Sequence, residues 1–293
     1  MDYIEFLDAI RQLNENTYFY GNEVLYKMAA ESDILIPEQL SGAMWLIGRS
    51  YAASPQRRSY PNHWKVRPDN DGRDQFFSFI ANRIPLDNLL PADKHFSYDG
   101  GDDDLSLLTQ SVAMVLQFNL SLSKAIEQFD NAPSSTYCTN HISFCSKFLH
   151  FYYRHTVFII DSYAQCGAAF LFGGYHSKKH RYVCLPHCDH TSDFLKEDVY
   201  EKFAKKSVNK IAERIESDLA DLIVQYQHRK PENAKAYIAH CVRSYLLGCR
   251  LREAGIQPSP RLAGESYCST PRLIDTVFLN IKSADSANHV ADI

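Results

Sequence analysis

Apolar residues recur along most of the chain at the three- and four-residue spacing of an amphipathic helix. Ile142, Cys145, Leu149 and Tyr152 follow one another at steps of three, four and three, which places them on one buried face. We see no internal repeat and no convincing β-sheet, so the pattern predicts an all-α fold. The expected helices cover residues 2–13, 22–31, 37–53, 73–84, 102–118, 121–129, 140–153, 161–172, 195–226, 231–253 and 271–282.

Proline positions and local composition predict two helix starts and two loops. Prolines are well tolerated at the first turn of a helix, so Pro37 and Pro231 are expected to open the helices that they precede. Residues 54–71 are rich in proline and residues 175–194 are rich in Lys and His, so both are expected to be loops. The small, polar tail, residues 284–293, is expected to fray.

Composition narrows the class of protein. A chain of 293 residues with 45% hydrophobic content is expected to fold as one large unit or as two lobes that share a core. No apolar run approaches the roughly 18 residues that span a bilayer, and the acidic, amphipathic start is unlike a signal peptide. We therefore expect a cytoplasmic protein without a membrane partner. Its eight cysteines are then expected to be reduced core residues.

Charge bears on nucleic-acid binding. The net charge of −4 argues against a passive nucleic-acid coat, although it leaves room for a local basic groove.

The most informative segment runs from Cys145 to Asp161. It joins a buried helix through the apolar connector Val157-Phe-Ile-Ile160 to an aspartate at the start of the next helix. Over residues 139–172 this segment resembles the helix-hairpin-helix DNA glycosylases, in particular the archaeal 8-oxoguanine branch. Those proteins carry a similar Ala-Ser-x-Phe-Leu segment, a short connector and an apolar pair before the catalytic Asp.

The resemblance implies a fold and a catalytic residue. It implies two helical lobes around a central cleft, with a central lobe of residues 73–172 and a terminal lobe of residues 1–72 with 195–283. It also implies that Asp161 is catalytic, because Ile159-Ile160-Asp161 stands where the family has its apolar pair and catalytic Asp.

The family's hairpin and its lysine differ in this sequence. The Gly-x-Gly hairpin, whose backbone amides approach a DNA phosphate, is replaced by Thr139, Asn140 and His141, so side chains would have to make that contact. Bifunctional members form a Schiff base with a lysine, and Ser143 stands at that position. Lys147 lies one helical turn further on. The resemblance therefore implies hydrolysis without strand cleavage, with DNA or base contacts at Asn140, His141, Ser143 and Lys147.

The physical chemistry of Asp161 leaves two interpretations open. Cleavage of an N-glycosidic bond builds positive charge on the sugar, which a fixed carboxylate stabilises while it orients or deprotonates a water. A helix N-terminus favours the ionised form of such an aspartate. However, Asp is also a preferred N-cap, and most N-cap aspartates have no other role.

Two basic segments are candidate DNA contacts. Trp45–Arg58 ends a helix in an arginine-rich, aromatic loop, and we select Arg49, Tyr51, Arg57 and Arg58 because arginines hold phosphates and aromatics stack on exposed bases. The second segment contains Lys178 and Lys179, close to the helix after Asp161. Either segment could equally be a solvated loop.

Metal and cofactor motifs are not found. Cys184, His187, Cys188 and His190 are close together, but their spacing matches no known metal motif, and no iron–sulfur pattern of four cysteines is present. No P-loop, dinucleotide-binding glycine fingerprint or nucleophile-elbow serine occurs. We therefore expect neither a metal nor a cofactor.

Together these features predict a monofunctional DNA glycosylase that flips a damaged or hypermodified base out of DNA and hydrolyses its N-glycosidic bond. A hypermodified base in bacteriophage DNA would make the protein a defence factor. The alternatives are a non-catalytic helical nucleic-acid-binding module and a helical adaptor protein.

Overall fold

The structure, a computed structural model, describes residues 2–16, 20–51, 53, 55, 71–86, 97, 98, 100, 101, 103–130, 141–172, 181–183, 197–203, 205–226, 231–259 and 269–283. Across these residues all regular secondary structure is helical apart from one pair of short strands. The periodicity therefore predicted the dominant structure of the described part of the chain correctly.

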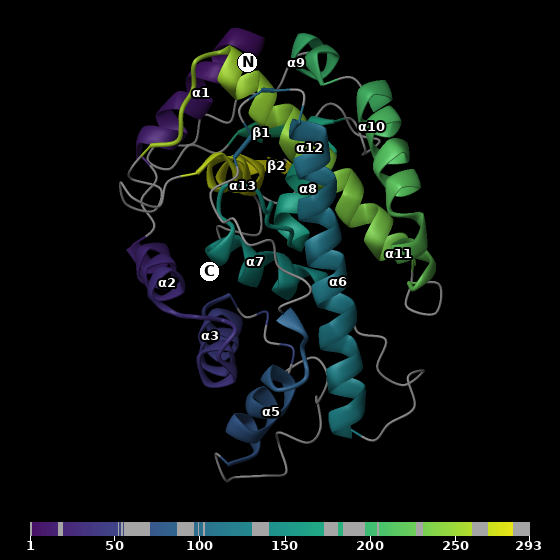
Figure 1. The fold of residues 1–293 in the computed structure, drawn as a ribbon. Helices are drawn as coiled ribbons and strands as arrows, with labels where there is room; N and C mark the ends of the chain where they lie inside the picture. Colours follow the sequence, from purple (N-terminus) through teal and green to yellow (C-terminus); the bar gives the residue numbers. More distant parts are fainter. Residues whose placement is uncertain are drawn as a thin grey trace.

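The N-terminal helices form at the expected places. They are α1 (Tyr3–Asn16), α2 (Tyr20–Glu31) and α3 (Pro37–Ser50), followed after the undescribed segment by α5 (Asp71–Ala81). Pro37 stands in the first turn of α3, as predicted. Figure 1 shows α2, α3 and α5 gathered at one end of the molecule, where α3 packs on α5 and α2 packs on α7 (Ile142–Tyr152).

The long helix α6 (Asp104–Asp130) corrects one expectation, because the two helices predicted at 102–118 and 121–129 are continuous. The polar Asn119 lies between the two predicted helices, and its carboxamide is satisfied within the core. Its Nδ2 donates to the Tyr226 hydroxyl at 3.0 Å, and its Oδ1 accepts from the His141 backbone N–H at 3.0 Å. With that residue satisfied, the buried stripe continues through Leu122 and Ile126.

Helix α6 also corrects the expectation about apolar length. Residues Asp104–Phe129 have the length and apolar composition of a membrane span. The sequence shows no purely apolar run here because serines and Asn119 interrupt it. These residues carry no charge, so an 18-residue stretch of the helix is still apolar on average. Of that stretch, 56% is buried within the protein, as in the core helix of a folded domain.

The C-terminal part corrects the single helix expected at 195–226. It consists of α9 (Glu197–Lys202), α10 (Lys205–Asp218) and α11 (Ala220–Val224). Leu219 has φ −106° and ψ 19°, which ends α10. The turn directs Tyr226 toward α6, where its hydroxyl donates to the Leu116 carbonyl at 2.7 Å. The helix therefore breaks at Leu219, because burial of Tyr226 against α6 is favoured over continuing one helix along the apolar stripe.

The last helices follow the sequence prediction closely. Helix α12 (Pro231–Glu253) begins at Pro231, and α13 (Thr270–Asn280) is capped by the Ser269 hydroxyl, which accepts from the Arg272 backbone N–H. Strands β1 (Arg181–Val183) and β2 (Ile281–Ser283) pair antiparallel. They lie in the expected loop 175–194 and at the end of the expected helix 271–282. Three-residue strands are too short to produce a recognisable alternation.

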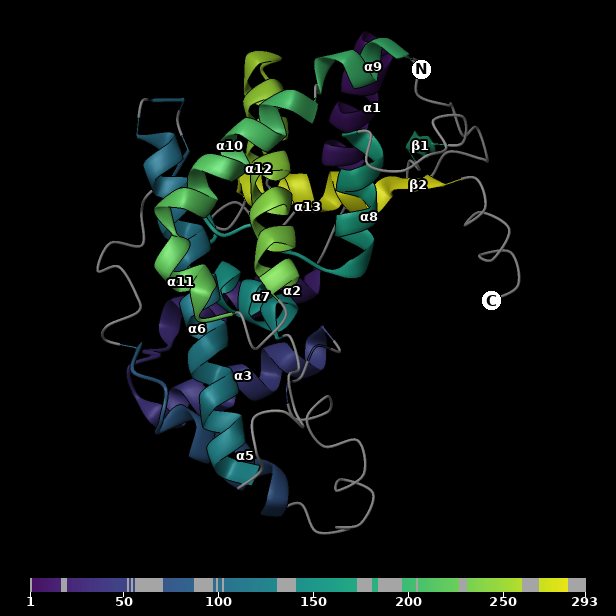
Figure 2. The same cartoon turned by 90° about the vertical axis from the view of Figure 1, so that its right-hand side faces the viewer.

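The buried apolar side chains form one cluster that draws on the helices of both expected lobes. Cys145 and Cys241 belong to it, as expected for reduced core cysteines. Figures 1 and 2 show α6 running along the molecule, with α5 at one end and α1 and α9 at the other. The boundary between lobes 73–172 and 1–72 with 195–283 stays a prediction.

Candidate active site

Residues 157–160, which connect α7 to α8 (Ser162–Leu171), have no regular secondary structure and are buried. Their polar backbone groups, and the carbonyl of Thr156 just before them, bond to side chains that come mostly from helices, which replaces the strand partners of a sheet. This arrangement fixes the position of the following residue, Asp161. Tyr98 and Ser111 donate to the Thr156 carbonyl, and His150 donates to the Val157 carbonyl. Tyr237 donates to the Phe158 carbonyl and His240 to the Ile159 carbonyl. The Ile160 N–H donates to the Ser146 hydroxyl.

Both histidines that hold the connector are neutral. Burial lowers the pKa of His150 to about 3 and that of His240 to about 4, although each backbone bond raises it slightly. His150 Nδ1 donates to the Val157 carbonyl, so its Nε2 accepts from the Tyr26 hydroxyl. His240 Nε2 donates to the Ile159 carbonyl at 2.8 Å. The connector thus depends on two uncharged imidazoles.

Asp161 has two partners, and it is still open to solvent. Its Oδ1 accepts from the Ala164 backbone N–H at 2.8 Å, which caps the first turn of α8. Its Oδ2 lies 3.3 Å from Lys147 Nζ on α7. The Asp161 side chain is 23% exposed and that of Lys147 only 7%. The carboxylate is therefore rigidly oriented, with one side facing solvent.

That side faces a cavity of about 400 Å³. Its wall combines aromatic, apolar and uncharged polar side chains around the Asp161–Lys147 pair. Tyr51, which follows α3, also faces Lys147, with Nζ 5.3 Å from the ring centroid. Burial raises the pKa of the Tyr51 hydroxyl, which is therefore neutral. The lining residues are Tyr51, Ala53, Ile142, Ser143, Lys147, Ile160, Asp161, Ser162, Tyr163, Gln165, Asn233 and Ala236.

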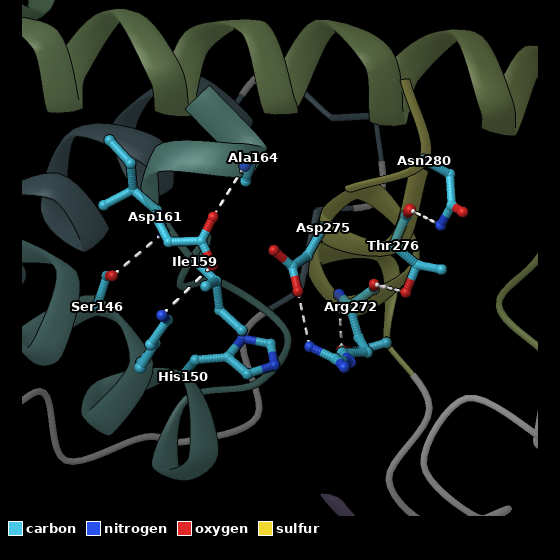
Figure 3. A network of polar contacts seen from close by, with 12 residues as sticks. Ser146, His150, Ile159, Asp161, Ala164, Arg272, Asp275, Thr276 and Asn280 are labelled. Atoms are coloured by element: carbon cyan, nitrogen blue, oxygen red, sulfur yellow. Dashed lines mark hydrogen bonds and ion pairs between the residues drawn. The ribbon is translucent and has the colours of Figure 1, made fainter. Parts of the chain in front are cut away.

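A second ion pair lies close enough to the first for the charges of Asp161 and Lys147 to act on it. Arg272 donates to Asp275 Oδ2 at 2.7 Å, and both side chains on α13 are 4% exposed. Figure 3 shows the Asp275 carboxyl group turned toward the side on which Asp161 lies. Burial raises the pKa of Asp275 to about 6, Arg272 opposes that shift, and the charge of Asp161 adds to it. Asp275 Oδ1 has no hydrogen-bond partner among the described residues.

Close packing brings these two helices together. Gly167 on α8 lies against the backbone of α13, since a Cβ there would come within 2.0 Å of the Phe278 carbonyl oxygen. Only glycine permits this approach. It sets the Asp161 end of α8 beside the buried pair on α13.

The structure brings four of the selected residues together. Tyr51, Ser143, Lys147 and Asp161 all line the cavity, and the common face expected for Ser143 and Lys147 is observed. Of the two, Lys147 is the one that forms an ion pair with Asp161, at 3.3 Å.

Two selected residues do not line the cavity. Arg49 is exposed on α3, with its guanidinium carbon 5.9 Å from the Trp45 ring centroid. His141 is buried beside Asn119, so it does not reach the cavity as a DNA contact. The other selected residues, Arg57, Arg58, Asn140, Lys178 and Lys179, lie outside the described residues.

Metal binding at Cys184, His187, Cys188 and His190 also falls outside the described residues. Within the part of the chain that the structure describes, no cluster of three or more potential metal ligands occurs.

Sequence reasoning missed the residues that hold and surround the site. His150, His240, Gln165 and Asn233 were not among the residues selected from the sequence. A usable signal existed for Arg272 and Asp275, because two charges at i and i+3 stand among apolar residues on the buried α13.

No protein-family model, curated protein or solved structure matches the chain.

Proposed function

We propose that this protein is a monofunctional DNA glycosylase that hydrolyses the N-glycosidic bond of a damaged or hypermodified base. The observation that carries the proposal is a single oriented carboxylate, Asp161, which faces a cavity of about 400 Å³ from the start of α8. Such volumes lie within the usual range for small-molecule sites and accommodate one extruded base.

The chemistry required of Asp161 fits its surroundings. The C1′–N bond breaks with its electron pair on the base, and positive charge develops on the sugar. The Asp161 carboxylate stabilises that charge and accepts a proton from the attacking water, whose oxygen forms the new bond to C1′. The proton then passes to the departing base. Because Ala164 holds Oδ1, the carboxylate needs little reorganisation during the reaction.

Lys147 supports the hydrolytic version of this reaction. An ammonium group 3.3 Å from a carboxylate has its nitrogen lone pair in an N–H bond and is therefore no nucleophile. In this state Lys147 orients Asp161 from a nearly buried position.

The rim of the cavity suits DNA. The first turns of α8 and α12 both line it, and the positive ends of helix dipoles attract phosphate. Exposed Tyr163 and partly buried Tyr51 provide aromatic surface for a base. The proposed partner is therefore DNA that contains a modified base, encountered in the cytoplasm in repair or in defence against bacteriophage.

The substitution Asp161→Asn tests the proposal. Asn is nearly as good an N-cap as Asp, so the fold is expected to persist. Base release from duplexes with a panel of modified bases should fall at least about 100-fold, because the full negative charge beside the sugar is lost. Asp33→Asn is the matched control, since Asp33 also accepts a backbone N–H near the start of a helix but lies outside the cavity.

DNA binding of both variants should stay close to wild type, and both should unfold in one cooperative transition. The melting temperature should fall in Asp161→Asn alone, because that variant removes the ion-pair partner of the nearly buried Lys147. Undiminished base release by Asp161→Asn would overturn the assignment of Asp161. DNA binding without base release from any duplex would favour the nucleic-acid-binding module, and the absence of both would favour the adaptor.

A further inference from the structure

Two carboxamide side chains line the cavity beside Asp161. Gln165 lies one helical turn after Asp161 on α8, and Asn233 lies in the first turn of α12. Both side chains are partly exposed. Neither carboxamide forms a hydrogen bond with another side chain or backbone group in the part of the chain that the structure describes, so both are available to a ligand.

The helices dictate that these two groups face the same space. Residues i and i+4 share one face of a helix, so Gln165 projects from the face of α8 that carries Asp161. Asn233 and Ala236 are related by three residues and face the cavity together. Two amides on separate, firmly packed helices can therefore approach one flat ligand from different sides.

The chemistry of a carboxamide selects the ligand. Each presents one carbonyl acceptor and two N–H donors in a plane. Such a group pairs best with a ring edge that carries an acceptor and a donor side by side, as Asn and Gln do when they bind a base edge in DNA. The remaining wall offers apolar contacts from Ile142 and Ile160 and the ring of Tyr163, which is 75% exposed at the rim.

We propose that Gln165 and Asn233 determine the specificity of this cavity, and that its substrate class is a nucleobase with an adjacent hydrogen-bond donor and acceptor on one edge. The inference rests on the proposed function only in so far as the ligand is a base. A base whose ring nitrogen is methylated at that edge loses the donor and gains bulk, so the cavity rejects it.

Binding of free bases tests the inference without any DNA. The probes are 8-oxoguanine, hypoxanthine and uracil, each paired with its counterpart methylated at the edge nitrogen (N1 in the purines, N3 in uracil). Affinities are measured by ligand-observed saturation-transfer NMR and titration. The wild-type protein should bind at least one unmethylated base at least about tenfold more tightly than its methylated counterpart, as expected for loss of a paired hydrogen bond.

The variants Gln165→Met and Asn233→Leu keep the approximate side-chain volume and remove the amide. Each should reduce the discrimination between methylated and unmethylated base to less than about threefold. Gln110→Met is the control, because Gln110 is an exposed carboxamide on α6 outside the cavity, and it should leave discrimination unchanged.

The outcomes separate this inference from the proposed function. Amide-dependent discrimination between bases, without base release from any DNA, would support the inference and remove the glycosylase. Release that depends on Asp161 but is indifferent to Gln165, Asn233 and edge methylation would overturn the inference and retain the glycosylase. The inference is also overturned if the wild-type protein binds none of the free bases.

Discussion

At the residue scale, Lys147 is the side chain whose role distinguishes a hydrolytic from a strand-cleaving reaction in the function proposed above. Its amine lies in the cavity at 3.3 Å from Asp161, with 7% of its side chain exposed. Two reactions could use such an amine. As an ammonium ion it orients the carboxylate, whereas after losing a proton it could attack C1′ and form a Schiff base.

We predict the first of these, so the product strand should stay intact. Cleavage should appear only after added alkali or an abasic endonuclease, and borohydride should trap no protein–DNA adduct. The reason is that the nitrogen of Lys147, paired with a carboxylate, carries a proton on the lone pair needed for attack. The measurement is gel analysis of the strands and adducts after reaction with and without borohydride.

A trapped adduct would have a definite interpretation if variants are compared. Trapping that disappears in Lys147→Ala and persists in Lys27→Ala, an exposed lysine on α2 outside the cavity, would identify Lys147 as a nucleophile. The enzyme would then be a lyase, and the monofunctional proposal would be wrong.

At the scale of elements, the connector 157–160 is held by two side chains whose pKa values are shifted by burial. His150 and His240 are neutral in the fold because burial lowers their pKa values to about 3 and about 4. In the unfolded chain their pKa is near 6.5. Between these values the unfolded state binds more protons than the native state, so the free energy of unfolding decreases as the pH falls. Acid should therefore release the connector and Asp161 with it.

The variant His240→Gln should remove one part of this pH dependence. Gln can still donate to the Ile159 carbonyl, but it does not titrate. Between pH 6.5 and 4 the wild-type protein should lose about 3 kcal/mol of stability that the variant keeps. Urea unfolding at pH 7, 5.5 and 4.5 measures this as a difference between the two proteins. Asp275 is present in both, so its opposite trend between about pH 4 and 6 cancels.

Parallel pH profiles for the two proteins would contradict this explanation. They would mean that His240 is already protonated in the folded state, or that solvent reaches its ring.

At the scale of the whole molecule, the sequence predicted the parts of the fold that depend on local periodicity. The helix around Cys145, the connector and the helix after Asp161 were all recognisable, because each buries a contiguous stretch. The break at Leu219 was not, since it depends on contacts between Tyr226 and the distant Leu116. The candidate site divides in the same way. Asp161 was selected from the residues next to it in the sequence, whereas His240 could not be, because it lies 81 residues from the Ile159 carbonyl that it bonds.

The basic segment Trp45–Arg58 belongs to this scale as well, because the DNA binding proposed for it would depend on several charges acting together. Arg49 is exposed, and Tyr51 in the same segment lines the cavity, so this segment adjoins the site. Arg57 and Arg58 follow in the undescribed residues. If the three arginines bind DNA phosphates, their replacement removes contacts that release counterions on binding.

We predict that replacing Arg49, Arg57 and Arg58 with alanine weakens DNA binding and makes its dependence on salt shallower. Each lost phosphate contact should reduce the slope of log K against log salt concentration by about 0.9, so the triple variant should lose about 2 to 3. Binding isotherms at several salt concentrations give this slope. The control triple, Arg11, Arg214 and Arg250, removes equal charge outside the cavity lining and should change it little. Equal slopes in wild type and in the Arg49, Arg57 and Arg58 variant would show that the loop is merely solvated.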